Sequence, residues 1–461
     1  MYPIGMSGRQ FDVIVIGAGP AGEVAAGQAA GAELETAIVE QELIGGECSF
    51  YACMPSKALL RPGELIDETR RVPGVRELVR GELDPDVVLA RRDEVIHDLD
   101  DRGMVPWLAD RGVELYRGRA ALDGERTVVV GAERLTARKA VVIATGTTAA
   151  IPPIDGLAEV APWTNRQGTT AKSVPGRLLI LGGGVVGVEL AQAWSSLGAS
   201  VSLVEAADRL IAAEEPFAGE QVRTGLESGG VDVRTGVKAV GAARGEGGQV
   251  SLRLEGGDEL RGDELLVAVG RRPRTAELGL GTVGVDGDGY LEVDDRMRVG
   301  GSDWLYAIGD VNGRSLLTHM GKYQARICID NLLGRDVEAS AEKRGSPRVV
   351  FTEPQVAAVG LTLQGALDRG IDARAVDVET AANAGASFVG RNAPGTSRVV
   401  VDSDRRIVVG ATFVGPEIAE SLHAATIAVA GEVPIDRLAH AVPAFPTRSE
   451  LWLYLLEKLG D

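Results

Sequence analysis

Two segments of this chain share one pattern: an apolar strand, a glycine-rich turn, a helix and a second strand that ends in glutamate. In each copy the glutamate, Glu40 or Glu205, follows the first glycine of the turn, Gly17 or Gly182, by 23 residues. A buried parallel strand that leads into such a turn belongs to an architecture of alternating strands and helices. The duplicated spacing therefore predicts an α/β chain with two Rossmann-like domains.

The glycines of both turns and the terminal glutamates predict two bound dinucleotides. Residues without a Cβ let the backbone approach a pyrophosphate at a helix N-terminus. A glutamate at the end of the second strand is placed to accept hydrogen bonds from ribose hydroxyls. The residues assigned to dinucleotide binding by this pattern are Gly17, Gly19, Gly22 and Glu40 in the first copy, and Gly182, Gly184, Gly187 and Glu205 in the second.

The second copy also indicates which nicotinamide nucleotide binds there. The carboxylate of Glu205 accepts hydrogen bonds from a free ribose 2′-hydroxyl and repels a 2′-phosphate. The residues that follow offer one early basic side chain, Arg209, for such a phosphate. The sequence therefore favours NAD(H) over NADP(H) at this site.

The stretch 45–57 holds two of the three cysteines of the chain. Cys48 and Cys53 are separated by four residues, after a glycine pair and before Pro55, which can open a helix. A helix N-terminus and the nearby Lys57 both favour a thiolate, the nucleophile of thiol–disulfide exchange. Two buried thiols or half of a zinc site are the alternatives, although zinc usually takes four ligands with tighter cysteine spacing. The spacing alone leaves all three open.

Composition and charge narrow the classes of partner. The chain has 461 residues, too many for one ordinary core, so roughly two to four domains are expected. Its net charge of −18 repels phosphate backbones and anionic lipids, and its aromatic content of 4% argues against a stacking surface for nucleic acid. No apolar run is long enough to span a membrane, no secretory signal is visible, and the three cysteines fit a reducing compartment. We therefore expect a cytoplasmic protein with neither nucleic acid nor membrane partners.

The sequence pattern of the remaining residues predicts further helices and, in the C-terminal part, an antiparallel sheet. Helices are expected over 58–92, with an interruption near Pro73-Gly74, and over 95–111. From Val349 onward the pattern changes to an antiparallel sheet with two helices and no glycine fingerprint, which indicates an interface or scaffold domain. The strands expected there are Val349–Phe351, Val356–Leu361, Arg398–Val401 and Ile407–Val414.

Four features, in this order, resemble the flavoprotein disulfide reductases: a first fingerprint, C-x-x-x-x-C, a second fingerprint and Ile308-Gly309-Asp310. This is the pyridine nucleotide–disulfide oxidoreductase family of dihydrolipoamide dehydrogenase, glutathione reductase and mercuric reductase. The resemblance implies an FAD-binding domain in two parts, 10–160 and 286–338, around an NAD(P)-binding domain at 161–285. A C-terminal α+β dimerisation domain with an antiparallel sheet would occupy 339–461, and the protein would be a homodimer.

The resemblance also implies which residues hold the cofactors. FAD would be held by Gly17, Gly19, Pro20, Gly22, Glu40, Gly46, Lys57, Thr145, Gly146, Gly309 and Asp310. The nicotinamide nucleotide would be held by Gly182, Gly184, Gly187, Glu205 and Gly270. No metal site is expected.

In this family, hydride passes from the nicotinamide to the flavin, which then reduces the disulfide. By the resemblance, Cys53 would be the thiol on the flavin side and Cys48 the thiol that attacks substrate. Lys57 would lie near the flavin and pair with Glu189, so that the pair sets the charge beside the reacting atom. An ordinary ion pair is the alternative for these two residues.

The C-terminal segment departs from the family pattern. The disulfide reductases carry His-Pro-Thr…Glu, in which the histidine comes from the partner subunit and acts as general acid–base. Here the matching segment begins at Phe445 and keeps Glu450, and the nearby His440 is expected to be a surface residue. Phenylalanine cannot shuttle a proton, and general acid–base catalysis is typically worth roughly 10²–10⁴ in rate. Simple lipoamide turnover is therefore not expected.

The sequence thus predicts an FAD-containing, NADH-preferring oxidoreductase with a Cys48–Cys53 redox pair and a small-molecule thiol or disulfide substrate. One alternative is an NAD(P)H dehydrogenase that reduces quinones, dyes or metal ions, with the disulfide auxiliary. Another is a redox-sensing or scaffold flavoprotein without turnover. The third cysteine, Cys328, falls in an expected helix and is interpreted as a core residue.

Overall fold

The structure is a computed structural model that describes residues 8–460. The chain divides into two compact units. The first unit comprises the described residues up to Met54 together with 93–148 and 271–343, and it contains the first glycine fingerprint. The second unit comprises 55–92, 149–270 and the described residues from Arg344 onward, and it contains the second fingerprint.

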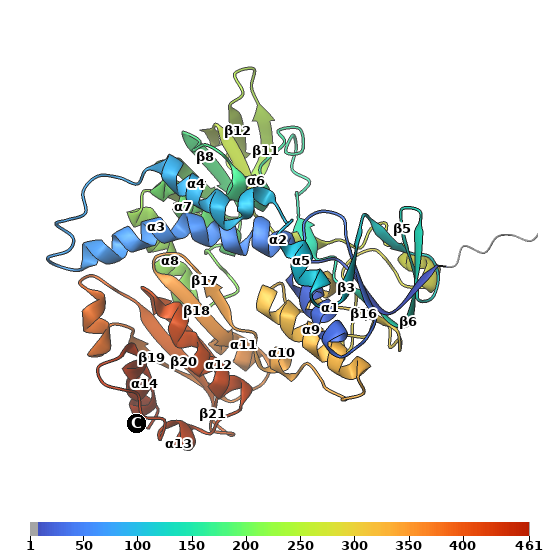
Figure 1. Cartoon of the computed structure of the whole chain (residues 1–461). Helices are drawn as coiled ribbons and strands as arrows, with labels where there is room; N and C mark the ends of the chain where they lie inside the picture. The colour runs from blue at the N-terminus through green and yellow to red at the C-terminus, as the bar shows by residue number, and fades with distance from the viewer. Residues whose placement is uncertain (1–7, 461) are drawn as a thin grey trace, which may run out of the picture. The chain divides into compact units, whose positions relative to one another are not determined.

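A seven-stranded sheet forms the centre of the first unit. Strand β1 (Arg9–Ile16) pairs in parallel with both β2 (Thr36–Glu40) and β6 (Glu133–Ile143). The side chains of β1 alternate between two cores, as the pleat requires. Val13 and Val15 join the core that includes α1 (Pro20–Gly31) and α9 (Thr318–Leu332), which pack alongside each other (Figure 1). In spatial order the strands are β3 (Val113–Arg117), β2 (Thr36–Glu40), β1 (Arg9–Ile16), β6 (Glu133–Ile143), β5 (Thr127–Val130) and β4 (Ala120–Leu122), with β16 (Leu305–Ala307) parallel to β6.

The other elements of the first unit surround this sheet or connect its strands. They are α1 (Pro20–Gly31), α2 (Gly46–Phe50), η1 (His97–Leu99), α5 (Met104–Ala109), β15 (Arg271–Pro273), η2 (Leu280–Val283), η3 (Gly309–Asn312) and α9 (Thr318–Leu332). Four elements cross a division between the units: α3 (Cys53–Arg71), α4 (Pro85–Val95), β7 (Thr147–Ala149) and α10 (Ser340–Arg344).

The second unit contains three sheets. The second fingerprint lies in a four-stranded parallel sheet of order β10-β9-β8-β14, made of β10 (Asp232–Arg234), β9 (Ser200–Val204), β8 (Arg177–Leu181) and β14 (Glu264–Val267). A three-stranded antiparallel sheet joins β11 (Ala239–Arg244), β12 (Val250–Leu254) and β13 (Glu259–Gly262). The helices of this part are α6 (Asn165–Thr170), α7 (Val185–Ser196) and α8 (Pro216–Ser228).

The third sheet of this unit is C-terminal, antiparallel and five-stranded. Its order is β17 (Arg348–Val350), β18 (Gln355–Gly360), β21 (Ile407–Gly415), β20 (Thr396–Asp402) and β19 (Ala373–Glu379). It is accompanied by α11 (Leu363–Asp368), η4 (Gly385–Val389), η5 (Ile418–Ser421), α12 (Leu422–Ala430), α13 (Ile435–Leu438), η6 (Arg448–Glu450) and α14 (Leu451–Gly460). The predicted fold class, two dinucleotide-binding α/β parts followed by an antiparallel α+β part, is confirmed.

The helix predicted over 95–111 is wrong. His97, Asp98 and Leu99 take φ values of +51°, +51° and +60°, and only the short η1 and α5 form in this stretch. The cause is tertiary: Asp101, which is buried, accepts hydrogen bonds from the Ile44 backbone N–H at 2.8 Å and from Arg117 at 2.6 Å. Satisfying that buried carboxylate outweighs local helix propensity.

Two further elements differ from the sequence-based expectation. The helix predicted over 58–92 is two helices, α3 and α4, separated by a longer non-helical stretch than the Pro73-Gly74 interruption indicated. Strand β19 was not predicted, because it is an edge strand whose alternation is diluted by Arg374, Asp377 and Glu379.

Candidate dinucleotide and redox sites

The first glycine fingerprint forms a tight turn whose shape excludes side chains. Gly17 has φ +103°, and a Cβ there would lie 2.4 Å from the carbonyl oxygen of Ala144. A Cβ on Gly22 would lie 1.9 Å from the carbonyl oxygen of Gly17, so the first turn of α1 packs directly on the loop. At Gly19, by contrast, an added Cβ would meet nothing within 4 Å, and this N-cap residue supplies no side-chain cap. The open helix N-terminus suits a phosphate.

The second fingerprint repeats this arrangement. Gly182 has φ +111°, and a Cβ on Gly187 would lie 1.9 Å from the Gly182 carbonyl oxygen. Gly184 is the uncapped N-cap of α7, and a Cβ there would again meet nothing within 4 Å. Gly270, also assigned to this nucleotide, has φ +141° and accepts a hydrogen bond from the Ala150 N–H at 3.0 Å.

The two terminal glutamates are held in the same way. Glu40 accepts hydrogen bonds from the backbone N–H groups of Ala18 and Glu42, each at 2.7 Å. Glu205 accepts from Gly183 at 2.5 Å and from Ala207 at 2.7 Å. A carboxylate has about four lone-pair directions, so each glutamate keeps acceptor capacity for ribose hydroxyls. Both fingerprints therefore fit dinucleotides.

The cysteine stretch lies against the first fingerprint. The Gly45 N–H donates to the Ala18 carbonyl at 2.7 Å, and Gly46, with φ +57°, approaches Gly19 so closely that a Cβ would lie 2.9 Å from its Cα. This packing places α2, which carries Cys48, directly beside the turn assigned to the pyrophosphate.

The side chains of Cys48 and Cys53 contact each other. Cys53 is the first residue of α3, and its Sγ lies 3.4 Å from Oγ1 of Thr318, the first residue of α9. The contact with Cys53 and burial raise the pKa of the Cys48 thiol, while Thr318 and Lys322 act in the opposite direction. Helix N-termini favour thiolates, so the pair occupies a position suited to redox chemistry.

The other cysteine hypotheses gain no support from this geometry. Between residues 8 and 460 no group of three or more His, Cys, Asp or Glu side chains is arranged to hold a metal ion, so a zinc site at Cys48 and Cys53 would lack its other ligands there.

Cys328 is completely buried in the core of the first unit, and burial raises the pKa of its thiol.

Asp310 belongs to a compact polar cluster. Its Oδ2 accepts from the Thr147 hydroxyl at 2.8 Å, and Thr147 Oγ1 in turn accepts from Arg271 Nε at 2.6 Å. Burial raises the pKa of Asp310, and the Thr147 hydrogen bond and the Arg271 charge oppose that shift. A partly buried carboxylate with spare acceptor capacity fits a cofactor hydroxyl.

Thr145 and Gly146, the two residues before β7, make a second contact to the segment 271–274. Thr145 donates through Oγ1 to the Arg274 carbonyl at 2.8 Å, and the Arg274 N–H donates to the Gly146 carbonyl at 3.0 Å. The Arg274 side chain also lies 3.3 Å from Glu47, the residue before Cys48. Thr147, Arg271 and Arg274 were not predicted from the sequence.

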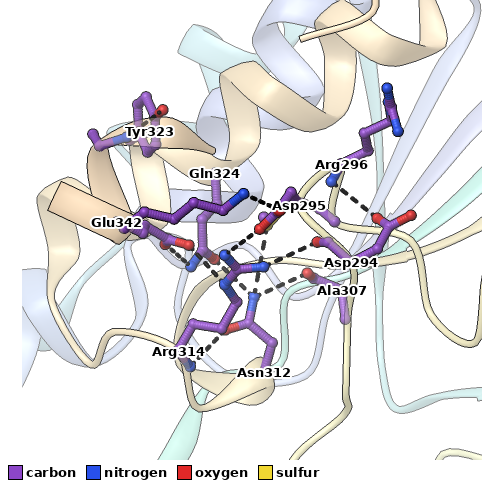
Figure 2. A network of polar contacts seen from close by, with 12 residues as sticks. Asp294, Asp295, Arg296, Ala307, Asn312, Arg314, Tyr323, Gln324 and Glu342 are labelled. Atoms are coloured by element: carbon purple, nitrogen blue, oxygen red, sulfur yellow. Dashed lines mark hydrogen bonds and ion pairs between the residues drawn. The ribbon is translucent and has the colours of Figure 1, made fainter. Parts of the chain in front are cut away.

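A network of polar contacts connects Asn312, Gln324, Glu342 and Arg314 (Figure 2). The Oε1 of Gln324, which is fully buried, accepts from the Gly309 N–H at 2.6 Å and from Asn312 at 2.9 Å. The Gln324 amide donates to Glu342 at 2.5 Å, and the other Glu342 oxygen lies 2.7 Å from Arg314 Nε. The turn that carries Asp310 is therefore fixed by side chains from α9 and α10.

The predicted Lys57–Glu189 pair forms within the second unit. Lys57 Nζ lies 2.7 Å from Glu189 Oε2, and Glu189 on α7 is only 3% exposed. The other carboxylate oxygen accepts from the Phe351 N–H at 3.0 Å, and the Lys57 ammonium lies 4.6 Å from the centroid of the Phe351 ring. Phe351 was not singled out from the sequence.

Phe445, which stands where the family pattern has histidine, lies at the surface. Phe445 is 77% exposed, and His440 is exposed as well. Glu450 is buried, and its Oε2 has no hydrogen-bond partner among the residues that the structure describes.

Comparison with known proteins assigns the family. Residues 11–325 match the pyridine nucleotide-disulphide oxidoreductase family, and residues 346–455 match the dimerisation domain of that family. The chain is a pyridine nucleotide-disulphide oxidoreductase. As a member of this family it is an FAD-dependent oxidoreductase, and the dimerisation domain supports a homodimer.

The oxidoreductase is similar over nearly its whole length to dihydrolipoyl dehydrogenases. It is 34% identical to the dihydrolipoyl dehydrogenase of Thermus scotoductus over 450 residues, covering 96% of each chain. It is 33% identical to dihydrolipoyl dehydrogenase 3 of Pseudomonas aeruginosa over 464 residues, with the same coverage.

Solved structures give the same fold. The HOCl-induced flavoprotein disulfide reductase RclA from Escherichia coli superposes with a TM-score of 0.85 at 26% identity, covering 97% of this chain and 99% of RclA. LpdA from Mycobacterium tuberculosis superposes with a TM-score of 0.85 at 25% identity, covering 98% and 99%. Across the described residues of the oxidoreductase, no helix is long and apolar enough to cross a membrane.

Proposed function

We propose that this oxidoreductase takes hydride from NADH and passes the electrons through FAD to a Cys48–Cys53 disulfide, which reduces a small-molecule acceptor other than free lipoamide. In balance, NADH, one proton and the disulfide give NAD⁺ and two thiols. Bound FAD would supply the two-electron link between nucleotide and disulfide. The observation that carries this proposal is the contact between the two thiols, with the Thr318 hydroxyl 3.4 Å from Cys53 Sγ.

The described residues support separate tasks in this reaction. The uncapped N-termini of α1 and α7 would bind the two pyrophosphates, and Glu40 and Asp310 would accept from FAD hydroxyls. The hydroxyl of Thr318 would donate to the thiolate of the reduced pair. Lys57 and Glu189 would set the charge on the flavin side.

NAD(H) is the proposed nucleotide because the second site favours a free 2′-hydroxyl. Glu205 is fixed by two backbone N–H groups, so its charge cannot easily turn away from a 2′-phosphate. Arg209 donates to the carbonyl of Ala212 at 2.7 Å, which engages the basic side chain that could otherwise meet that phosphate.

The proposed acceptor is not free lipoamide because the acid–base position holds Phe445. An exposed phenyl ring cannot donate a proton to a leaving thiolate, and Glu450 Oε2 has no hydrogen-bond partner among the described residues. We further propose a homodimer in a reducing cytoplasm, with FAD-binding segments at 10–160 and 286–338, an NAD-binding domain at 161–285 and a dimerisation domain at 339–461.

A second candidate is reduction of metal ions, quinones or dyes. It is favoured by the pair of thiols in contact, because soft sulfur ligands suit copper, and by the likeness to RclA, of which a Cu(II) complex has been solved. In that case the thiols would bind the acceptor directly, or they would be auxiliary and the flavin would reduce it.

Anaerobic titration of the holoenzyme with NADH tests the first proposal. We expect a long-wavelength absorption band after about two electrons, from a Cys53 thiolate beside oxidised flavin, with loss of the band in the Cys48→Ser/Cys53→Ser double variant. Cys328→Ser, in the buried core, is the matched control and should keep the band. Direct bleaching of the flavin without the band in the unmodified enzyme would exclude the disulfide from the reaction and favour the second candidate.

A further inference from the structure

Lys57 is held by two elements besides its own helix. Its ammonium lies 2.7 Å from Oε2 of Glu189 on α7 and 4.6 Å from the centroid of the Phe351 ring, and it also donates to Ser56 Oγ at 3.3 Å. Phe351 directly follows strand β17 and lies within the segment 346–455 that matches the dimerisation domain.

The position of Phe351 is set by α7. Glu189 and Gln192, three residues apart and therefore on one face of this helix, both accept backbone hydrogen bonds from the turn after β17. Glu189 Oε1 accepts from the Phe351 N–H at 3.0 Å, and Gln192 Oε1 accepts from the Glu353 N–H at 2.7 Å. One carboxylate thus fixes the backbone of Phe351 with one oxygen and the ammonium of Lys57 with the other.

The ring adds a constraint that the ion pair lacks. A lysine side chain has many rotamers, and here it is 37% exposed, so a single carboxylate would leave the ammonium free to swing about it. The electron-rich face of Phe351 attracts the ammonium from a second direction, an interaction worth about 0.5–2 kcal/mol. Glu189 is itself held by a backbone N–H, so both sides of the clamp are rigid.

We propose that Phe351 is a positioning residue of the redox centre: its backbone N–H orients Glu189 and its ring holds the Lys57 ammonium in place. The dimerisation domain would then contribute to electron transfer within its own chain and not only to the contact between subunits. This inference rests on the proposed function in one respect, the assignment of Lys57 to the flavin side.

Two readouts on the holoenzyme test the proposal. The first is the rate at which limiting acetic anhydride acylates Lys57, followed by mass spectrometry relative to the other lysines. In Phe351→Leu we expect that rate to rise about 3- to 10-fold, because the amino group is no longer held against the ring and is more accessible to the reagent. The second is the midpoint potential of the flavin, which should fall, because a less well-placed positive charge stabilises the reduced form less.

Matched variants separate positioning from packing. Phe351→Tyr keeps the aromatic face and should restore both readouts. Phe217→Leu removes a comparable ring that lies 5.0 Å from the Arg398 guanidinium in the same unit, and it should change neither. If Phe351→Leu leaves the acylation rate of Lys57 unchanged, or matches Phe217→Leu in both readouts, the clamp is refuted.

The failure of the proposed function would look different. If acylation rises in Phe351→Leu but the potential is unchanged both there and in Lys57→Met, the clamp exists but Lys57 does not act on the flavin, which overturns the redox role of both residues. If Lys57→Met lowers the potential and Phe351→Leu does not, Lys57 has its proposed role and Phe351 does not position it.

Discussion

Glu40 and Glu205 accept equivalent pairs of backbone hydrogen bonds. In each pair, one N–H belongs to the residue after the first glycine of the turn, and the other belongs to the residue two positions after the glutamate. The match extends the sequence duplication to the level of single hydrogen bonds. It means that each carboxylate is oriented before any nucleotide arrives, so little conformational entropy is lost when a ribose binds.

Removal of the second carboxylate should weaken discrimination between the two nicotinamide nucleotides. We expect Glu205→Gln to lower kcat/KM for NADH about 10-fold, since a hydrogen bond to a charged group is worth roughly 1.5–3 kcal/mol. The kcat/KM for NADPH should stay the same or rise. Arg209→Ala should have little effect on either nucleotide, because its guanidinium is already bonded to backbone carbonyls. Equal kcat/KM for NADH and NADPH in the unmodified enzyme would contradict the assignment.

Loss of the Thr318 hydroxyl should make the reduced cysteine pair less reactive. Thr318 counteracts the raised pKa of Cys48, so Thr318→Val should raise that pKa further and slow alkylation of the reduced enzyme by iodoacetamide at pH 7 about 3- to 10-fold. Thr426→Val is a matched control, since that hydroxyl donates to the Leu422 carbonyl within its own helix α12. Alkylation at the unmodified rate would show that the hydroxyl does not stabilise the thiolate.

The dinucleotide turns could be predicted from the sequence because their physics is local. Gly17 and Gly182 need positive φ and closeness to a neighbouring strand, and the glutamates lie at a fixed distance along one βαβ unit. The Lys57–Glu189 pair came from resemblance to a family and not from any local pattern, and the structure places its atoms 2.7 Å apart.

The parts that were missed depend on contacts between distant segments. Thr318, Arg271 and Phe351 have no motif of their own, and each makes its contact only because folding brings it beside a cysteine, an aspartate or a lysine. The wrong helix over 95–111 has the same cause, because Asp101 is drawn to Ile44, far earlier in the chain. Periodicity reports which face of an element is apolar, and it carries no information about such partners.

A histidine at position 445 tests whether the missing acid–base group is the reason that free lipoamide is a poor substrate. Phe445→His should raise dihydrolipoamide turnover, by up to roughly 10²–10⁴ if proton transfer alone is limiting. The exposed ring can be replaced at little cost to stability, and Phe445→Leu should give no gain. If turnover with histidine equals turnover with leucine, the substrate pocket itself differs from that of lipoamide dehydrogenases.

Glu23 should make the stability of the fold fall as pH rises toward neutrality. Burial is the main reason that the pKa of this carboxyl, in the first turn of α1, is raised from 4.5 to about 7, and its Oε1 has no hydrogen-bond partner among the described residues. Between pH 4.5 and 7 the native state keeps a proton that the unfolded chain has released, so the free energy of unfolding decreases through this window and levels off above it.

Glu23→Gln should remove that pH dependence. We expect the variant to be more stable than the unmodified enzyme at pH 8, by up to about 3 kcal/mol, and nearly equal to it at pH 4.5. Bound FAD would bring further negative charge to the N-terminus of α1, so the difference should have the same sign in the holoenzyme. Urea unfolding of both proteins across this pH range measures it, with Glu33→Gln as a control on a nearby surface carboxylate. A difference that grows toward low pH would show that Glu23 is charged in the native state and stabilised by Lys322.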